Sequence, residues 1–154
     1  LDRFRWVEGH ADVWRLFADG PTLQAVVHCL ADPWRDIGIT KISGVEARGF
    51  ILGPPVALEL GVGFVAVRKE AGLLPGPKIT ITADEDYRGE RHVLRIQRAS
   101  VAAGDRVLLA DDWAERGAQA LAIRDLVERC GATFVGASLI VDQLDDGSER
   151  RSVK

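Results

Sequence analysis

An acidic pair that follows an apolar run is the strongest candidate for chemistry in this sequence. Asp111 and Asp112 come directly after residues 106–110, which are apolar past the first and predict a central parallel strand covered on both faces. A short loop and a helix over 117–130 follow. Ligands of such sheets bind beyond the carboxyl ends of strands, and N–H groups at a helix start bind phosphate. The pair suits the hydroxyl groups of a phosphorylated ribose, although an acidic pair alone can also be a solvated loop.

The elements that would position this pair alternate in type from residue 37 onward. Short β-branched apolar runs predict strands at 37–43, 62–67, 106–110 and 134–141. Helical spacing predicts helices at 22–30, 50–60 and 117–130, the first of them capped by Thr22. Residues 68–78 are rich in Gly, Pro and charge and predict a loop, after which 79–82 and 92–96 alternate like a hairpin. The pattern predicts an α/β fold with a mostly parallel twisted sheet flanked by helices.

Composition limits the partners and the setting. A chain of 154 residues with 47% hydrophobic content suits a single domain over 1–154. A formal net charge of -3 favours neither nucleic acid nor a membrane surface as a partner. Cys29 and Cys130 lie far apart and predict neither a disulfide nor a metal site, which favours a reducing cytoplasm. The first residues lack the apolar stretch of a signal peptide, so export is not expected.

An ordered series of motifs resembles a known family. The run Val107-Leu108-Leu109-Ala110-Asp111-Asp112, followed by Gly117, resembles the phosphoribosyl diphosphate motif of type I phosphoribosyltransferases. Further segments stand in the order seen in adenine phosphoribosyltransferases, at 44–54, 58–61, 67–69, 74–76 and 94–97. The resemblance implies the type I phosphoribosyltransferase fold, with a hairpin flap at about 70–98. It also implies transfer of a 5-phosphoribosyl group from phosphoribosyl diphosphate to adenine or a related nitrogen base, releasing pyrophosphate, as a glycosyltransferase of purine salvage.

The resemblance assigns roles to individual residues. It implies a ribose-phosphate site of Asp111, Asp112, Trp113, Ala114, Glu115, Arg116, Gly117, Ala118 and Gln119. It implies a pyrophosphate site of Glu46, Ala47, Arg48, Arg68 and Lys69. The base would meet Val13, Trp14 and Arg15, although Trp14 could instead cover the core. Arg48, Asp112 and Asp86 would be catalytic, Asp86 matching an acidic residue that precedes a Tyr in the family hairpin.

Magnesium and a second copy of the chain are also implied. Arg, Lys and Mg²⁺ around a departing pyrophosphate stabilise the transition state more than the ground state. Mg²⁺ is expected to arrive with phosphoribosyl diphosphate, because the sequence offers no separate cage of protein ligands. The resemblance further implies a homodimer in which flap and Arg-rich turn lie near the subunit boundary.

The phosphate loop and the flap depart from the family pattern. Family members usually carry Thr-Gly-Gly-Thr where this chain has Arg116-Gly117-Ala118-Gln119, so both hydroxyls are missing. The usual Lys before Leu-Pro-Gly in the flap is absent as well. Arg116 could bind a phosphate or pair inward with the acidic residues. These departures motivate a second hypothesis, a non-catalytic nucleotide-binding or regulatory module of the same fold.

Overall fold

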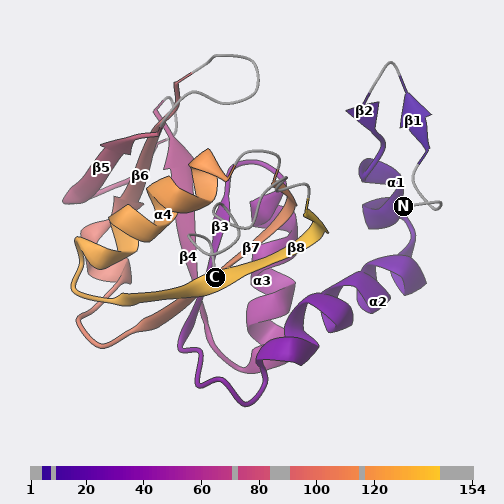
Figure 1. Ribbon diagram of the computed structural model, residues 1–154, viewed down its shortest axis with the longest axis horizontal. Coiled ribbons are helices and arrows are strands. Elements are labelled where there is room, and N and C mark those ends of the chain that lie inside the picture. The colour runs from indigo at the N-terminus through magenta and orange to yellow at the C-terminus, as the bar shows by residue number, and fades with distance from the viewer. Residues whose placement is uncertain (1–4, 8–9, 71–72, 84–90, 115–116, 143–154) are drawn as a thin grey trace.

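Six strands form one sheet at the centre of the molecule. The structure is a computed structural model that describes residues 5–7, 10–70, 73–83, 91–114 and 117–142 (Figure 1). In spatial order the strands are β5 (Lys78–Thr82), β6 (Val93–Gln97), β4 (Gly63–Lys69), β3 (Lys41–Val45), β7 (Arg106–Ala114) and β8 (Thr133–Asp142). The last four of these run parallel, whereas β5 and β6 form an antiparallel hairpin that pairs with β4. The predicted α/β fold with a mostly parallel sheet is therefore confirmed.

Helices cover both faces of this sheet. They are α1 (Trp14–Ala18), α2 (Gly20–Ala31), α3 (Gly49–Leu60) and α4 (Ala118–Glu128), with short 3-10 turns η1 (Asp32–Trp34) and η2 (Arg98–Ser100). Figure 1 shows α4 in front of the sheet, while β1 (Trp6–Val7), β2 (His10–Ala11) and α1 stand at the opposite end of the molecule from the β5–β6 hairpin. Among the described residues, no helix has both the length and the apolar character needed to cross a membrane.

The strand that carries the acidic pair separates two apolar cores. Val107 and Leu109 pack with Ile123 and Leu126 of α4 in one core cluster. Leu108 and Ala110 belong to the other cluster, which contains buried residues of α2 and α3. Successive side chains of a strand point to opposite faces, so four consecutive apolar residues fill both cores. The prediction that this strand is central and covered on both faces is thus confirmed.

Two predicted boundaries near the start of the chain are wrong. The cap of α2 is Asp19 rather than Thr22, because the Asp19 carboxylate accepts the Thr22 N–H at 2.9 Å. The first long strand begins at Lys41 rather than at residue 37. Gly38 adopts φ 73°, a left-handed conformation that ends the preceding turn and delays the strand.

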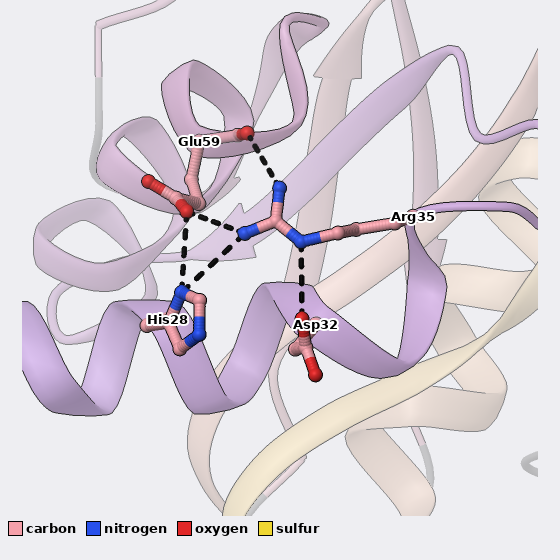
Figure 2. Close-up of polar contacts among 4 residues, drawn as sticks. All are labelled: His28, Asp32, Arg35 and Glu59. Carbon is pink, nitrogen blue, oxygen red and sulfur yellow. Dashed lines mark hydrogen bonds and ion pairs between the residues drawn. The ribbon is translucent and has the colours of Figure 1, made fainter.

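Polar contacts fix α2 against the end of α3. Figure 2 shows the Arg35 guanidinium between Asp32, at 3.1 Å, and the Glu59 carboxylate, at 2.5 Å. His28 Nδ1 lies 3.3 Å from Glu59 Oε1. The hydrogen bond from Arg35, and then the one from His28, lower the pKa of Glu59. All four side chains are exposed, so the network orients the helices more than it stabilises the fold.

A pair of glycines brings β3 against the start of α3, and this contact is testable. A Cβ on Gly44 would overlap the backbone carbonyl of Gly49 and lie 3.1 Å from Phe64 Cε2. We expect Gly44→Ala to lower the free energy of unfolding by about 2 kcal/mol or more, because backbone atoms cannot move aside cheaply. Gly20→Ala is the matched control, since nothing lies within 4 Å of its Cβ position. Equal unfolding midpoints for the two variants in urea would contradict this account.

Candidate active site

The acidic pair lies inside β7, just past the last residue of β7 that pairs with β3. β7 pairs with β3 only as far as Leu109 opposite Ser43, yet it pairs with β8 as far as Ala114 opposite Asp142. The sequence prediction that the strand ends before the acidic pair is therefore wrong. On the β3 side, however, the pair does lie beyond the last paired residue. That edge is where ligands of parallel sheets bind.

Both carboxylates are almost completely buried. Asp111 is 5% exposed and Asp112 is 2% exposed. The Asp112 N–H donates to Asp111 Oδ1 at 3.0 Å, and Gln119 Nε2 donates to Asp111 Oδ2 at 3.0 Å. Burial, and then the neighbouring charge of Asp112, raise the pKa of Asp111 to about 8. A buried pair of like charges is costly to the fold and typical of a site kept for function.

The turn between β3 and α3 places a cation on this pair. Arg48 is the residue before α3, and its Nε lies 3.0 Å from Asp112 Oδ2. This contact is an ion pair without the alignment of a hydrogen bond, so Oδ2 is a buried oxygen with no hydrogen-bond donor among the described residues. Ala47 and Arg48 are exposed. The structure thus brings together the predicted acidic pair and the predicted Arg48 turn.

Glu46 connects the same turn to β4. The Arg68 guanidinium donates to both Glu46 oxygens, at 3.0 and 3.2 Å, and the Lys69 N–H donates to Glu46 Oε2 at 3.2 Å. Arg68 also donates to the Leu73 carbonyl at 2.8 Å. Arg68 and Lys69 belong to β4 and pair with β6, so the predicted start of a loop at residue 68 is wrong. Arg68 therefore spans the turn, the sheet and the beginning of the flap.

The pairing of Glu46 with Arg68 predicts a pH effect on stability. The hydrogen bond from Arg68, more than that from the Lys69 N–H, lowers the pKa of Glu46 below 4.5. A lowered carboxyl pKa stabilises the folded state above the unfolded pKa, and this stabilisation is lost as pH falls through the folded value. We expect Glu46→Gln to cost about 1 kcal/mol at neutral pH and progressively less below about pH 4. Chemical denaturation at several pH values, with the exposed Glu128→Gln as control, measures this; a cost that does not change with pH contradicts it.

The start of α4 faces the acidic pair from the other side. Gly117 adopts φ 71° as the residue before α4, and Ala118 is already helical. Ala118 therefore needs no positive φ. Gln119, the second residue of α4, reaches back to Asp111. Glu115, Arg116 and the side chain of Ala114 lie outside the described residues.

The residues predicted to contact the base are divided between two regions. Val13 is 1% exposed, whereas Trp14 is 54% exposed and makes an edge-on ring contact with Phe17 at 5.9 Å. Arg15 Nε lies 3.7 Å from Asp12 Oδ2. Asp86 and its neighbour Glu85 lie outside the described residues. An exposed indole is available to a flat ligand, and the roles assigned to these residues stay predictions.

Sequence reasoning missed two polar contacts around the site. Arg95 of β6 donates to the Lys69 carbonyl at 3.2 Å and to the Glu70 carbonyl, so it holds the end of β4. Gln119 was predicted as part of the phosphate loop, and its side-chain bond to Asp111 was not anticipated. Neither contact has a signal in residue spacing, because each depends on how the loops fold back.

Two solved structures share this fold. An adenine phosphoribosyltransferase from Saccharomyces cerevisiae, complexed with adenine and an imino-altritol bisphosphate, has a TM-score of 0.80 at 32% identity and is matched over 94% of this chain and 82% of that one. The enzyme from Trypanosoma brucei, in complex with AMP, pyrophosphate and ribose-5-phosphate, has a TM-score of 0.75 at 30% identity, over 82% of this chain and 55% of that one. The fold is that of the type I phosphoribosyltransferases.

Sequence similarity gives the family. No model of a known protein family matches the chain. The adenine phosphoribosyltransferase of Pectobacterium carotovorum subsp. carotovorum (strain PC1) is 41% identical over 140 residues, which cover 91% of this chain and 74% of that relative. The chain belongs to the adenine phosphoribosyltransferase family and is a phosphoribosyltransferase, a transferase of the glycosyltransferase type. The family resemblance inferred from the motifs is thereby confirmed.

Proposed function

We propose that this enzyme transfers the 5-phosphoribosyl group of phosphoribosyl diphosphate to adenine in purine salvage and nucleotide metabolism, releasing pyrophosphate and AMP. The observation that carries the proposal is the buried acidic pair beside Arg48, where Asp112 Oδ2 has no hydrogen-bond donor among the described residues. A carboxylate oxygen left in this way is suited to accept a ligand hydroxyl. Adenine and AMP are the ligands of the two solved relatives described above.

The proposed site residues fall into four groups, which bind the ribose hydroxyls, the 5-phosphate, the pyrophosphate and the base. The ribose hydroxyl groups donate to Asp111 and Asp112, and the backbone N–H groups at the start of α4 bind the 5-phosphate. Arg48, before α3, and Lys69, at the end of β4, are the proposed cations on the side of the departing pyrophosphate. Negative charge grows on that group as the ribose carbon leaves it, so a fixed guanidinium stabilises the transition state most. Val13, Trp14 and Arg15 remain the proposed contacts of the base, and Asp86 its proposed proton partner.

Magnesium fits the same edge of the sheet. Carboxylate oxygens are ligands that Mg²⁺ prefers, and Asp111 and Asp112 present buried ones. Within the described chain, no group of three or more His, Cys, Asp or Glu side chains could hold a metal ion by itself. Asp111 and Asp112 would therefore hold Mg²⁺ together with the substrate's own oxygens, and the bound ion would neutralise charge on the pyrophosphate.

A homodimer is the proposed assembly, and one helix supports it. α3 is apolar on nearly every side, and its row of Ile51, Pro54, Pro55 and Leu58 is half-buried at best, with Leu58 82% exposed. A helix that is apolar all round is normally covered on all sides. We expect a dimer in light scattering, and Leu58→Asp should shift it toward monomer without unfolding it. A monomeric native chain would contradict the proposal; Glu128→Gln is the control.

The proposed location is the cytoplasm. Cys29 and Cys130 are both free thiols, one exposed and one buried. Free thiols persist in reducing compartments, where nucleotide metabolism also takes place. Labelling of the exposed Cys29 in intact cells by a thiol reagent that crosses membranes, and protection from one that does not, would support this.

A direct assay tests the reaction. The protein is incubated with phosphoribosyl diphosphate, Mg²⁺ and each of adenine, guanine, hypoxanthine and uracil, and pyrophosphate release is followed. We expect release with adenine above all, matched by formation of AMP. Folded protein that releases no pyrophosphate with any base would contradict the proposal. Tight AMP binding without turnover would instead favour the non-catalytic alternative.

A further inference from the structure

In this structure, Asp111 has a donor on each oxygen. Oδ1 accepts the Asp112 N–H and Oδ2 accepts Gln119 Nε2, both at 3.0 Å. Arg48 covers the neighbouring Asp112 through its ion pair. Asp111 is only 5% exposed and Asp112 only 2% exposed. The residues that would receive the ribose are closed over by side chains of the protein itself.

A carboxylate oxygen can accept two hydrogen bonds, but at 5% exposure Asp111 has little room for a ribose hydroxyl beside the donors that it already has. The main-chain donor to Oδ1 belongs to β7 and is fixed by its pairing with β8. Gln119 is different, because its amide sits on a rotatable side chain in the first turn of α4 and is only partly buried. Of the two donors to Asp111, Gln119 can therefore move away at the lower cost in free energy. Its departure frees Asp111 Oδ2, which can then accept a ribose hydroxyl.

We propose that Gln119 is a positioning residue that occupies Asp111 Oδ2 in place of a ribose hydroxyl, and that the substrate must displace it. The inference rests on the proposed function and adds to it an affinity-setting residue. When the substrate displaces Gln119, Asp111 Oδ2 loses one hydrogen-bond donor and gains another. The free energy of substrate binding is therefore smaller than it would be at a carboxylate without a donor. When the competent state is only a fraction of the ligand-free population, the observed affinity falls by that fraction.

The side chain at position 119 determines this effect through its length and its amide. Gln has a donor nitrogen far enough from the backbone to reach Asp111 from α4, and no charge to attract or repel phosphate. Met has nearly the same length and lacks the donor. Gln119→Met should therefore leave Asp111 Oδ2 without its partner until the ribose arrives. Without ligand, the variant should be less stable than the native protein. AMP should raise the unfolding midpoint of the variant by more than it raises that of the native protein.

Calorimetry with AMP measures the predicted change in affinity. We expect Gln119→Met to lower the Kd for AMP roughly 3- to 10-fold, in line with the loss of one competing hydrogen bond. The KM for phosphoribosyl diphosphate should fall in the same direction, while kcat should not rise. Glu128→Gln, at the exposed far end of the same helix, should leave all three values unchanged. An unchanged or higher Kd in the Met variant would overturn the inference.

A second measurement on the native protein keeps the inference testable if the variant does not fold. The side-chain amide of Gln119 is followed by NMR as AMP is added. We expect a large change in its chemical shifts and faster exchange with solvent at saturation; signals that stay in place would overturn displacement. A native protein that turns over while Gln119→Met binds AMP more weakly would overturn the inference alone. A native protein that binds neither AMP nor phosphoribosyl diphosphate would overturn the proposed function as well.

Discussion

Asp111→Asn should make the protein more stable at pH 8 and, at the same time, poorer at binding its ligand. Burial and the charge of Asp112 raise the pKa of Asp111 from 3.8 to about 8. The folded state therefore holds the carboxyl proton of Asp111 more tightly than the unfolded chain does. Stability from this group is complete below the unfolded pKa and is lost as pH rises toward the folded value. Asn is neutral at every pH and avoids that loss.

The measurement is a series of unfolding curves between about pH 5 and pH 9. The stability difference between Asp111→Asn and the native protein should grow with pH and level off above about pH 8. At the plateau it should be at least about 1 kcal/mol, since one pKa unit corresponds to about 1.4 kcal/mol. Asp36→Asn, at an exposed position, should show no such trend. A difference that is constant across this range would contradict the raised pKa.

Above about pH 8, where Asp111 is ionised, the same substitution should weaken AMP binding roughly 10- to 100-fold, because a hydrogen bond to a charged group is stronger than one to an amide. The double variant with Asp111→Asn and Asp112→Asn should bind AMP more weakly still. The Asp36→Asn control should bind like the native protein. A gain in stability together with a loss of affinity for AMP identifies a carboxylate that serves binding. Removal of a carboxylate that serves the fold would lower both the stability and the affinity.

Arg48→Ala should chiefly reduce the chemical step. Arg48 is 44% exposed, so the part of its side chain that is not against Asp112 can face a ligand. We expect kcat to fall on the order of 100- to 1,000-fold, as for loss of one preorganised donor to a developing charge, with a smaller change in KM. Steady-state kinetics with adenine and phosphoribosyl diphosphate measure both values.

Two further variants make the Arg48 result specific. Arg48→Lys keeps the charge and loses the planar fork, so it should recover part of kcat. Arg35→Ala removes a guanidinium from the α2–α3 network, outside the site, and should leave kcat unchanged. If Arg48→Ala raised KM and left kcat intact, Arg48 would bind substrate and transition state equally, contrary to its assigned role.

Periodicity predicted the sheet well and its polar ends poorly. The apolar run at 106–110 identified the central strand, because burial on both faces leaves a continuous apolar pattern. The same pattern stopped at Asp111, although pairing with β8 carries the strand on to Ala114. Likewise β4 continues through Arg68 and Lys69, although their charges favour the start of a loop at residue 68. Charged residues can continue a strand where they find polar partners, as Arg68 does with Glu46, so hydropathy alone misplaces the boundary.

The proximity of the predicted residues could be expected from the sequence, whereas their individual contacts could not. The acidic pair and the Arg48 turn could be selected by motif order, and the fold does bring Arg48 to Asp112. The contacts of Gln119 with Asp111 and of Glu46 with Arg68 depend on rotamers and on the path of the turns. Residue types and spacing do not determine these, because several polar partners of similar length lie close by in the sequence.

The isolation of α1 suggests how this enzyme can change through evolution. None of the residues of α1 is buried, and the helix packs mainly against α2, whereas Asp111 and Arg48 are fixed by the central sheet and its turn. Substitutions at Trp14 or Arg15 should therefore cost little folding energy, while those around the acidic pair disturb the core. With Trp14 and Arg15 as the proposed contacts of the base, preference for one base over another can then change between lineages while the sugar chemistry stays constant.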